Sequence, residues 1–241
     1  MQPQNDQWMR ISALLSIFYP SVCPMCGEYS EGFCNACIRS LPRTEQAQMR
    51  QNETEMVLIE NSRNVVGAMK AMRLKQAAAF LFYEKDHPIR HLIHRMKYAE
   101  EPNIGYTLGR MAAIEMQYTD FFDGIDVIIP MPLHPKRLRE RGYNQSEYIA
   151  RGISDIIGVP VDTTHVIRSR NTPKQALQTG EERKRNVADA FAVHHPEQLY
   201  HKHILIVDDL ITTGETVRSC LRAMRCIRGA HYTVFALCKA K

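Results

Sequence analysis

From about residue 86 onward, apolar residues follow two alternating spacings. Short continuous apolar runs predict strands, whereas positions that recur at i, i+3, i+4 and i+7, such as Ile89, Leu92, Ile93 and Met96, predict helices. A strand without polar alternation has no solvent-facing side, which is typical of a parallel sheet between two layers of helices. The pattern therefore predicts an α/β fold. The predicted strands cover residues 126–129, 160–167, 190–193, 204–207 and 232–237, and the predicted helices open at 87–88 and cover 105–118, 145–157 and 217–228.

The 241 residues exceed one typical domain without reaching the length of two. The apolar stretch 9–23 is short and ends without the small residues of a signal cleavage site, so it predicts an amphipathic helix. The apolar run 77–83 is a candidate strand. We therefore expect an N-terminal helix with a four-cysteine module in 1–42, a partly stranded connecting segment in 43–85 and the α/β domain in 86–241.

The amino-acid composition excludes several classes of protein. The chain is 44% hydrophobic and 24% charged, which excludes disordered and low-complexity classes. No window holds the ~18 consecutive apolar residues of a membrane-spanning helix, so we expect no membrane span. Seven cysteines, an odd number, fit a disulfide framework poorly, and we expect a cytoplasmic location. Cys220, Cys226 and Cys238 are expected to pack as small buried side chains.

The run between residues 203 and 216 carries the sharpest local signal. Four branched apolar residues predict a buried strand, and Asp208 and Asp209 follow at its carboxyl end. In open α/β sheets, this edge is where ligands bind. The two acids are therefore candidate binding residues.

A polar loop follows the acids and opens the next predicted helix; it holds Thr212, Thr213, Gly214 and Thr216. The glycine lets the backbone approach a ligand, the helix start has unsatisfied N–H groups, and the hydroxyls add donors. The loop has neither the lysine of a P-loop nor the glycine spacing of a dinucleotide fingerprint. We interpret it as a phosphate cradle. The structural alternative is an acid-capped strand end with Thr216 as the helix N-cap.

Acids and phosphate cradle together indicate one kind of ligand. Carboxylates so near a phosphate repel it unless they face something else, and vicinal hydroxyls or a magnesium ion are their natural partners. A ribose 5-phosphate fits both halves of the motif.

Four cysteines form two Cys-x-x-Cys turns, at Cys23 and Cys26 and at Cys34 and Cys37. Two such turns, seven residues apart, can direct four thiolates at one tetrahedral ion. Structural Zn²⁺ is the leading candidate. An iron–sulfur cluster or a redox pair is the alternative, because the gap is shorter than in many zinc ribbons.

The net charge of +5 is concentrated in residues 131–185, which hold eleven Lys/Arg against six Asp/Glu. Such a region attracts a polyanion, either a phosphate ligand or nucleic acid, and a solvated basic face is the alternative. Pro132 follows the predicted strand 126–129, and Arg137, Arg139 and Arg141 then offer cations to a dense anion. The basic stretch 168–185 is expected to be a lid over a charged ligand, or else a solvated loop.

The run from residue 206 to 216 resembles the phosphoribosyl-pyrophosphate motif of type I phosphoribosyltransferases. Segments 130–137 and 141–146 resemble the ComF family more narrowly. So do Arg168, Thr172, Gln175, Leu177, residues 183–191, the N-terminal cysteines, Leu92-Ile93-His94 and Lys97-Tyr98. The resemblance covers nearly the whole chain apart from about residues 43–75. It implies a type I phosphoribosyltransferase-like parallel sheet with helices on both faces, and a small zinc-ribbon-like module at the N-terminus.

The same resemblance implies roles for the candidate residues. Asp208 and Asp209 would be the catalytic acids that hold the ribose hydroxyls and an associated Mg²⁺. The threonine loop would bind the 5-phosphate, and the loop after strand 126–129, with Pro132, Arg137 and Arg141, would face pyrophosphate.

Two functions are compatible with these features. The first is a ComF-type protein that binds phosphoribosyl pyrophosphate or a similar ligand and acts in DNA uptake and single-stranded DNA handling during natural transformation. Single-stranded DNA and DNA-uptake proteins would be its partners, with Tyr143 and Tyr148 available for stacking. The second is an active phosphoribosyltransferase, for which nothing in the sequence identifies the acceptor.

Overall fold

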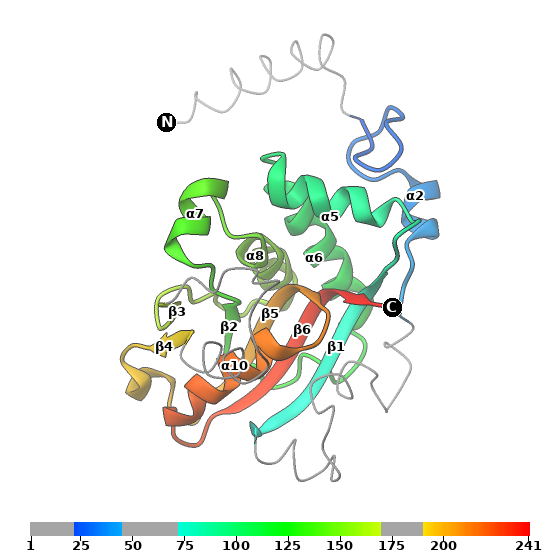
Figure 1. The fold of residues 1–241 in the computed structure, drawn as a ribbon. Coiled ribbons are helices and arrows are strands. Elements are labelled where there is room, and N and C mark those ends of the chain that lie inside the picture. Colours follow the sequence, from blue (N-terminus) through cyan, green and yellow to red (C-terminus); the bar gives the residue numbers. More distant parts are fainter. Residues whose placement is uncertain (1–21, 45–71, 170–189) are drawn as a thin grey trace, which may run out of the picture.

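The computed structural model describes residues 22–44, 72–169 and 190–241. Its centre is a four-stranded parallel sheet in the order β1-β6-β5-β2 (Figure 1). The expected amphipathic helix, apart from its last two residues, and nearly all of the expected lid lie outside the described residues. The strands are β1 (Leu74–Tyr83), β2 (Val127–Pro130), β5 (His203–Ile211) and β6 (His231–Ala240).

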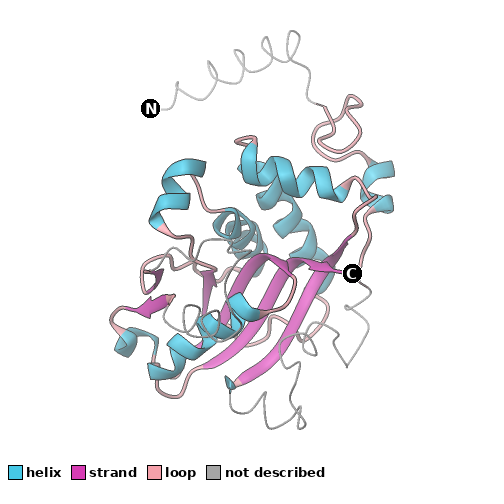
Figure 2. Ribbon diagram, viewed as in Figure 1, coloured by secondary structure: helices cyan, strands magenta, loops and turns pink. Residues whose placement is uncertain are grey.

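Helices cover both faces of this sheet, as the apolar runs predict (Figure 2). Successive residues of β5 alternate between two cores: Leu205 packs with the helices of one face, and Ile204 and Ile206 pack with those of the other. One face carries α5 (Ile89–Tyr98), α6 (Pro102–Met116) and α8 (Gln145–Ile157), and the other carries α10 (Glu215–Ala223) with the short η2 (Met224–Cys226).

Helix α8 lies close against α6 because glycine occupies the contact. A Cβ atom at Gly152 would lie 2.1 Å from the carbonyl oxygen of Tyr106, and one at Gly109 would lie 2.4 Å from that of Ile149. No side chain fits either gap. This close packing fixes the start of α8, where Asn144 caps the helix, beside the end of β2.

Chain segments extend the sheet at both sides. Beyond β2, the N–H of Ile128 donates to Pro160 at 2.9 Å and the N–H of Asp162 donates to Ile128 at 2.8 Å. Beyond β1, residues 42–44 form an antiparallel bridge in which Arg43 pairs with Leu81. The strand expected in the connecting segment thus lies inside the sheet, as β1.

The end of the predicted strand 160–167 and the predicted strand 190–193 lie outside the main sheet. β3 (Val166–Arg168) and β4 (Phe191–Val193) pair with each other in antiparallel fashion. Apolar runs indicate that a strand forms, but they do not specify its partner or direction. The two segments flank the expected lid in the sequence.

The four-cysteine module packs beside α5. It contains α2 (Asn35–Ser40) and a bridge between Val22 and Tyr29. Phe33 and Leu41 join the core beneath α5 and α6. α7 (Pro135–Arg141) stands apart from this core with no buried residue.

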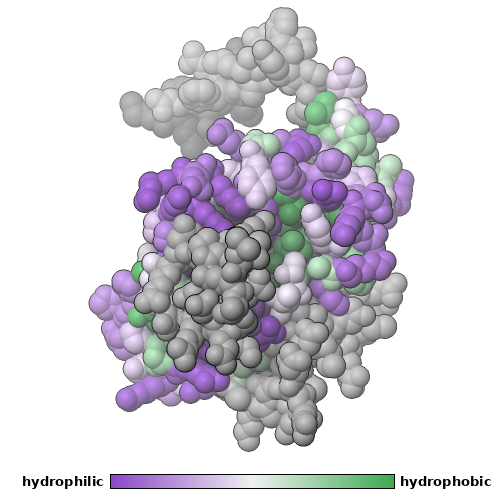
Figure 3. Space-filling view, in the orientation of Figure 1, coloured by the Kyte–Doolittle hydropathy of each residue, from purple (hydrophilic) through white to green (hydrophobic). Residues whose placement is uncertain are grey.

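No helix in the described segments is long and apolar enough to cross a membrane. Hydrophilic side chains cover most of the described surface in the view of Figure 3.

Candidate functional site

The order of the sheet reverses between β2 and β5. From β2 the chain continues to residues 160–162 on one side, and from β5 it continues to β6 on the other. Open α/β sheets bind ligands at such a point, outside the carboxyl ends of the strands. Pairing between β2 and β5 ends at Pro130 and Val207, so Asp208 and Asp209 lie just beyond it.

β5 continues through these acids to Ile211, paired with β6 alone. The predicted strand is therefore shorter than the observed one. We refer to Lys97, Asp208, Asp209 and the loop 212–216 as the carboxyl edge.

Asp208 is buried, with two donors on one carboxylate oxygen. The Ser146 Oγ donates to its Oδ1 at 3.3 Å, and the backbone N–H of Asp209 donates to the same atom at 2.9 Å. Burial raises the pKa of the Asp208 carboxyl to about 7, and the negative charge of Asp209 acts in the same direction. The carboxyl thus exchanges its proton near neutral pH.

Asp209 forms an ion pair with Lys97, whose Nζ lies 3.0 Å from Asp209 Oδ2. The two side chains are only 14% and 18% exposed, so salt screens the pair less than a surface pair. Lys97 comes from the last turn of α5, far from Asp209 in sequence. Only packing of α5 against the sheet brings it to the acids, which is why sequence reasoning assigned it no role in the site.

The threonine loop turns sharply into α10. Gly214 is the N-cap of the helix at φ 71°, a left-handed conformation that favours glycine, and no side chain caps the helix. The alternative in which Thr216 is the N-cap is therefore wrong. Thr212 and Thr213 are exposed, and the loop encloses a hollow of about 30 Å³ with Asp208 in its wall. Hydroxyls and free helix N–H groups around such a hollow can bind a phosphate.

The candidate residues after β2 occupy two different surroundings. Arg141 donates to Gln145 Oε1 at 3.0 Å, and its guanidinium lies 5.0 Å from the centre of the Tyr98 ring. Pro132 lines a largely apolar hollow of about 330 Å³, together with Leu133, Leu138 and Arg168.

Arg168 at the start of the expected lid lies within electrostatic reach of both Asp208 and Arg137. Burial lowers the pKa of its guanidinium, the charge of Arg137 lowers it further, and Asp208 opposes both effects. Arg168 thus brings positive charge near Asp208, and Arg137 lies near Arg168.

The four cysteines come together as expected. The Sγ atoms of Cys23, Cys26, Cys34 and Cys37 all lie within 4.8 Å of one another. The N–H of Cys34 donates to Cys23 Sγ at 3.4 Å. Burial raises the pKa of the Cys23 thiol. The N–H of Cys34 and the other backbone N–H donors outweigh burial, and together they lower this pKa to about 6. The pKa of Cys37 is raised, by burial and then by the neighbouring sulfurs. Four sulfurs this close together are the ligand set that a tetrahedral zinc ion takes.

The remaining cysteines follow the prediction only in part. Cys220 and Cys238 are buried, whereas Cys226 is exposed, and its Sγ lies 3.4 Å from the carbonyl of Ala223. The prediction for Cys226 is therefore wrong, because the chain leaves the helical spacing at η2.

The chain is similar to known proteins over the region that contains Asp208, Asp209 and the threonine loop. Residues 144–238 match the family model described as a phosphoribosyl transferase domain. The DNA utilization protein YhgH of Escherichia coli (strain K12) is 32% identical over 155 residues, which cover 63% of this chain and 67% of that protein. Competence protein F of Haemophilus influenzae is 28% identical over 157 residues, 64% of this chain and 69% of its own.

Solved structures give more distant matches. The allosteric regulatory enzyme of purine biosynthesis is 20% identical with a TM-score of 0.37, over 56% of this chain and 25% of that enzyme. The hypoxanthine phosphoribosyl transferase of Trypanosoma cruzi is 14% identical with a TM-score of 0.34, over 59% of this chain and 75% of its own.

Fold and site together define a domain of the phosphoribosyltransferase type joined to a four-cysteine module. The chain belongs to the ComF family.

Proposed function

We propose that the carboxyl edge binds a ribose 5-phosphate ligand, phosphoribosyl pyrophosphate or a close relative. The observation that carries this proposal is the adjacency of two acids, a threonine-lined hollow and cationic side chains at the reversal point of the sheet. Acids suit the ribose hydroxyls and Mg²⁺, and the loop suits a terminal phosphate.

Each group has a place in this proposal. Asp208 and Asp209 accept hydrogen bonds from the ribose hydroxyls or hold Mg²⁺, and loop residues Thr212, Thr213, Gly214 and Thr216 bind the 5-phosphate. The pyrophosphate lies toward Pro132, with Arg137 and Arg141 as cations. Lys97 already pairs with Asp209 at 3.0 Å, so ligand or Mg²⁺ must either displace it or share the carboxylate.

Calorimetric titration with phosphoribosyl pyrophosphate, with and without Mg²⁺, tests this site. We expect binding that requires Mg²⁺ and that is lost when Asp208 and Asp209 are both replaced by Asn. Binding that survives the double replacement would disprove the assignment.

We further propose that the protein acts in DNA uptake in the cytoplasm and handles single-stranded DNA. The names of the relatives support this, since they are called a DNA utilization protein and a competence protein. So does α7, which carries Lys136, Arg137, Arg139 and Arg141 beside the apolar hollow of about 330 Å³. Cations for phosphates next to an apolar pocket for a base suit a single strand.

Salt dependence tests this part. Affinity for a short single strand should fall steeply with salt. Replacing Arg137, Arg139 and Arg141 by Gln should reduce the slope by about 0.7 for each phosphate that the variant no longer neutralises. Affinity that is indifferent to salt rejects DNA binding.

An active phosphoribosyltransferase is the second candidate. A hollow of about 520 Å³ adjoins Thr212 and is lined by Tyr83, Asp86 and Leu210, which gives an acceptor room beside the proposed sugar site. In the reaction an acceptor nitrogen would form a bond to the anomeric carbon as the bond to pyrophosphate breaks, and Mg²⁺ would stabilise the leaving group. Pyrophosphate release with a panel of bases and amines tests this; release with none of them rejects it.

We propose structural Zn²⁺ for the cysteine module. Metal analysis of the purified protein should give close to one equivalent of zinc. Cys26→Ser should lower this content, and Cys226→Ser, outside the cluster, should not. Iron in place of zinc would overturn the assignment.

A further inference from the structure

The amino ends of three strands lie side by side at the edge of the sheet opposite the proposed ligand site. Lys202 directly precedes β5, Arg228 lies shortly before β6, and Lys75 is the second residue of β1. Backbone contacts join them: the N–H of His201 donates to Arg228 at 2.9 Å, and the N–H of His231 donates to Lys202 at 3.0 Å.

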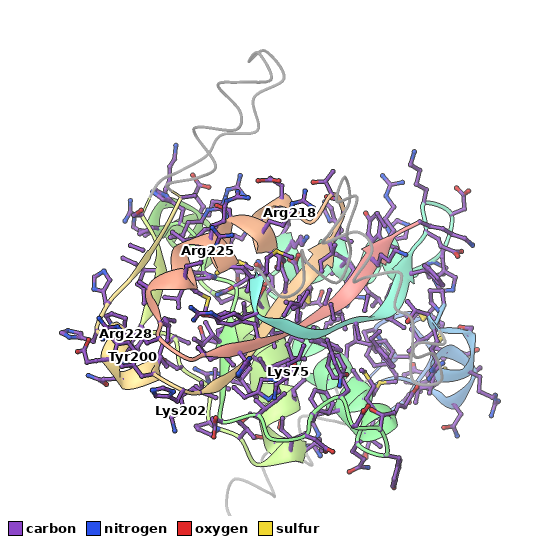
Figure 4. All side chains as sticks on the ribbon, turned by 90° about the horizontal axis from the view of Figure 1, so that it is seen from below. Lys75, Tyr200, Lys202, Arg218, Arg225 and Arg228 are labelled. Atoms are coloured by element: carbon purple, nitrogen blue, oxygen red, sulfur yellow. The ribbon has the colours of Figure 1, made fainter. Side chains whose placement is uncertain are left out.

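This edge gathers positive charge from segments far apart in sequence. Residues 72–75, 199–202 and 225–231 contain five Lys/Arg and no Asp or Glu. We call these five residues the amino edge: Arg73, Lys75, Lys202, Arg225 and Arg228. Lys75, Lys202, Arg225 and Arg228 are exposed, and Figure 4 shows them on the side seen from below.

An aromatic ring lies among these cations. The guanidinium of Arg228 lies 5.9 Å from the centre of the half-buried Tyr200 ring. Arg73 is anchored by a hydrogen bond of 2.8 Å from its Nη1 to the carbonyl of Ile227. Cations with an interleaved aromatic ring are the elements that contact the backbone and bases of a single strand.

Two acidic groups border this edge, and each has a partner outside the five cations. Asp126, on the β2 side, accepts the N–H of His203 at 2.8 Å, and Glu197, three residues before Tyr200, lies 3.4 Å from His195 Nδ1. Lys75 also acts on the buried His203. Burial is the main cause that lowers the pKa of this imidazole, and the positive charge of Lys75 lowers it further.

The distances between the cations of the amino edge suit a flexible polyanion. Neighbouring strands of a sheet lie about 4.8 Å apart, so cations on β1 and β5, two strands apart, start roughly 10 Å from each other. Long Lys and Arg side chains can span such gaps toward successive phosphates.

We propose that the amino edge is a second contact surface for single-stranded nucleic acid, separate from α7 and from the ribose-phosphate site. It rests on the proposed DNA-handling function and deepens it: one strand contacts the protein on the face where β1, β6 and β5 begin. The negative charge of the phosphates supplies the affinity, so recognition at this edge is independent of base sequence.

Cys226 provides a native reporter for this surface. Its thiol is exposed between Arg225 and Arg228, whereas Cys220 and Cys238 are buried and the other four cysteines form the cluster proposed to bind zinc. In the zinc-loaded full chain, a bound single strand should slow alkylation of Cys226 several-fold, with the modified residue identified by peptide mass.

Two matched triple variants locate the binding surface. Lys75→Gln with Lys202→Gln and Arg228→Gln removes three charges at the amino edge; Arg137→Gln with Arg139→Gln and Arg141→Gln removes three on α7. Log affinity falls with log salt, and we expect the amino-edge variant to make this slope less negative by about 2, at roughly 0.7 per phosphate that is no longer neutralised. It should also abolish Cys226 protection, while far-ultraviolet circular dichroism and zinc content stay unchanged.

Each other outcome has a defined meaning. Protection of Cys226 that persists in the amino-edge variant, or a loss of affinity confined to the α7 variant, overturns the proposal. Anionic vesicles that protect Cys226 as well as the oligonucleotide does would also overturn it, in favour of a membrane surface. Failure of phosphoribosyl pyrophosphate to bind would reject the ribose-phosphate site and leave this result standing.

Discussion

The two edges of the sheet carry opposite kinds of chemistry. At the carboxyl edge, one continuous run of sequence supplies two acids and a hydroxyl-rich loop within a few residues. At the amino edge, three distant segments each supply one or two cations. The first arrangement suits a small ligand that needs precise partners, whereas the second suits a long polymer that needs only charge. A compact motif can therefore be found in the sequence, whereas a dispersed patch can be found only once the order of the strands is known.

The largest effect is expected from the acids. Asp208→Asn with Asp209→Asn should weaken binding of phosphoribosyl pyrophosphate with Mg²⁺ by about 100-fold or more, because hydrogen bonds to charged groups contribute about 1.5–3 kcal/mol each. Calorimetry measures the loss. The same variant should leave Cys226 protection by a single strand unchanged; a parallel loss of both would mean that the two edges form one site.

A pH effect of about tenfold follows from the raised pKa of Asp208. If the ligand requires the ionised carboxylate, a pKa of about 7 implies that affinity rises roughly tenfold between pH 6 and pH 8. Phosphate groups titrate near pH 6 themselves, so Asp208→Asn is the control that isolates the carboxyl. An equally steep rise in that variant would assign the effect to the ligand.

Stability should change with pH in the opposite direction. Between the ordinary pKa of 3.8 and about 7, the folded chain keeps a proton that the unfolded chain has released. The contribution of Asp208 therefore lowers the free energy of unfolding as pH rises through this window. Thermal unfolding of Asp208→Asn should lack this slope, and its gain over the wild type should be larger at pH 8 than at pH 5.

Lys97→Met should have a several-fold effect on affinity near pH 7. The positive charge of Lys97 lowers the pKa of Asp208. Removing this charge should therefore raise that pKa and shift the midpoint of the affinity–pH profile upward. Arg90→Gln, at an exposed position of the same helix, is the matched control. An unchanged midpoint in Lys97→Met would show that the ion pair with Asp209 is not felt at Asp208.

The smallest effect is expected at Ser146. Its hydroxyl donates to Asp208 over 3.3 Å, a long hydrogen bond. Ser146→Ala should weaken ligand binding about two- to fivefold, the range of roughly 0.5–1 kcal/mol. A larger loss would indicate that the hydroxyl contacts the ligand directly.

Sequence reasoning reached the carboxyl edge because its signals are contiguous. Strand β5, the acids and the loop follow each other, and the spacing of two Cys-x-x-Cys turns predicts the four-cysteine cluster that the structure brings together. It missed Lys97 and Ser146, which reach Asp208 and Asp209 only because α5 and α8 pack on the same face of the sheet. It could not find the amino edge at all, since only strand order places Lys75 beside Arg228 and Lys202.

The sequence also did not reveal which strands pair with each other or in which direction. The apolar runs of β3 and β4 resemble those of β5, yet the two strands pair with each other outside the main sheet. Burial selects apolar residues in both settings, so composition alone does not distinguish them.

The short bridge at residues 42–44 has a consequence for shortened versions of this protein. The N–H of Phe82 donates to Pro42 at 2.7 Å and that of Thr44 to Phe80 at 3.1 Å, so this segment occupies hydrogen-bonding groups along the outer side of β1. A deletion that removes the cysteines together with these residues would leave bare backbone there, inviting another molecule to add a strand. A truncated phosphoribosyltransferase domain should therefore begin before residue 42, or its self-association will be mistaken for a natural oligomer.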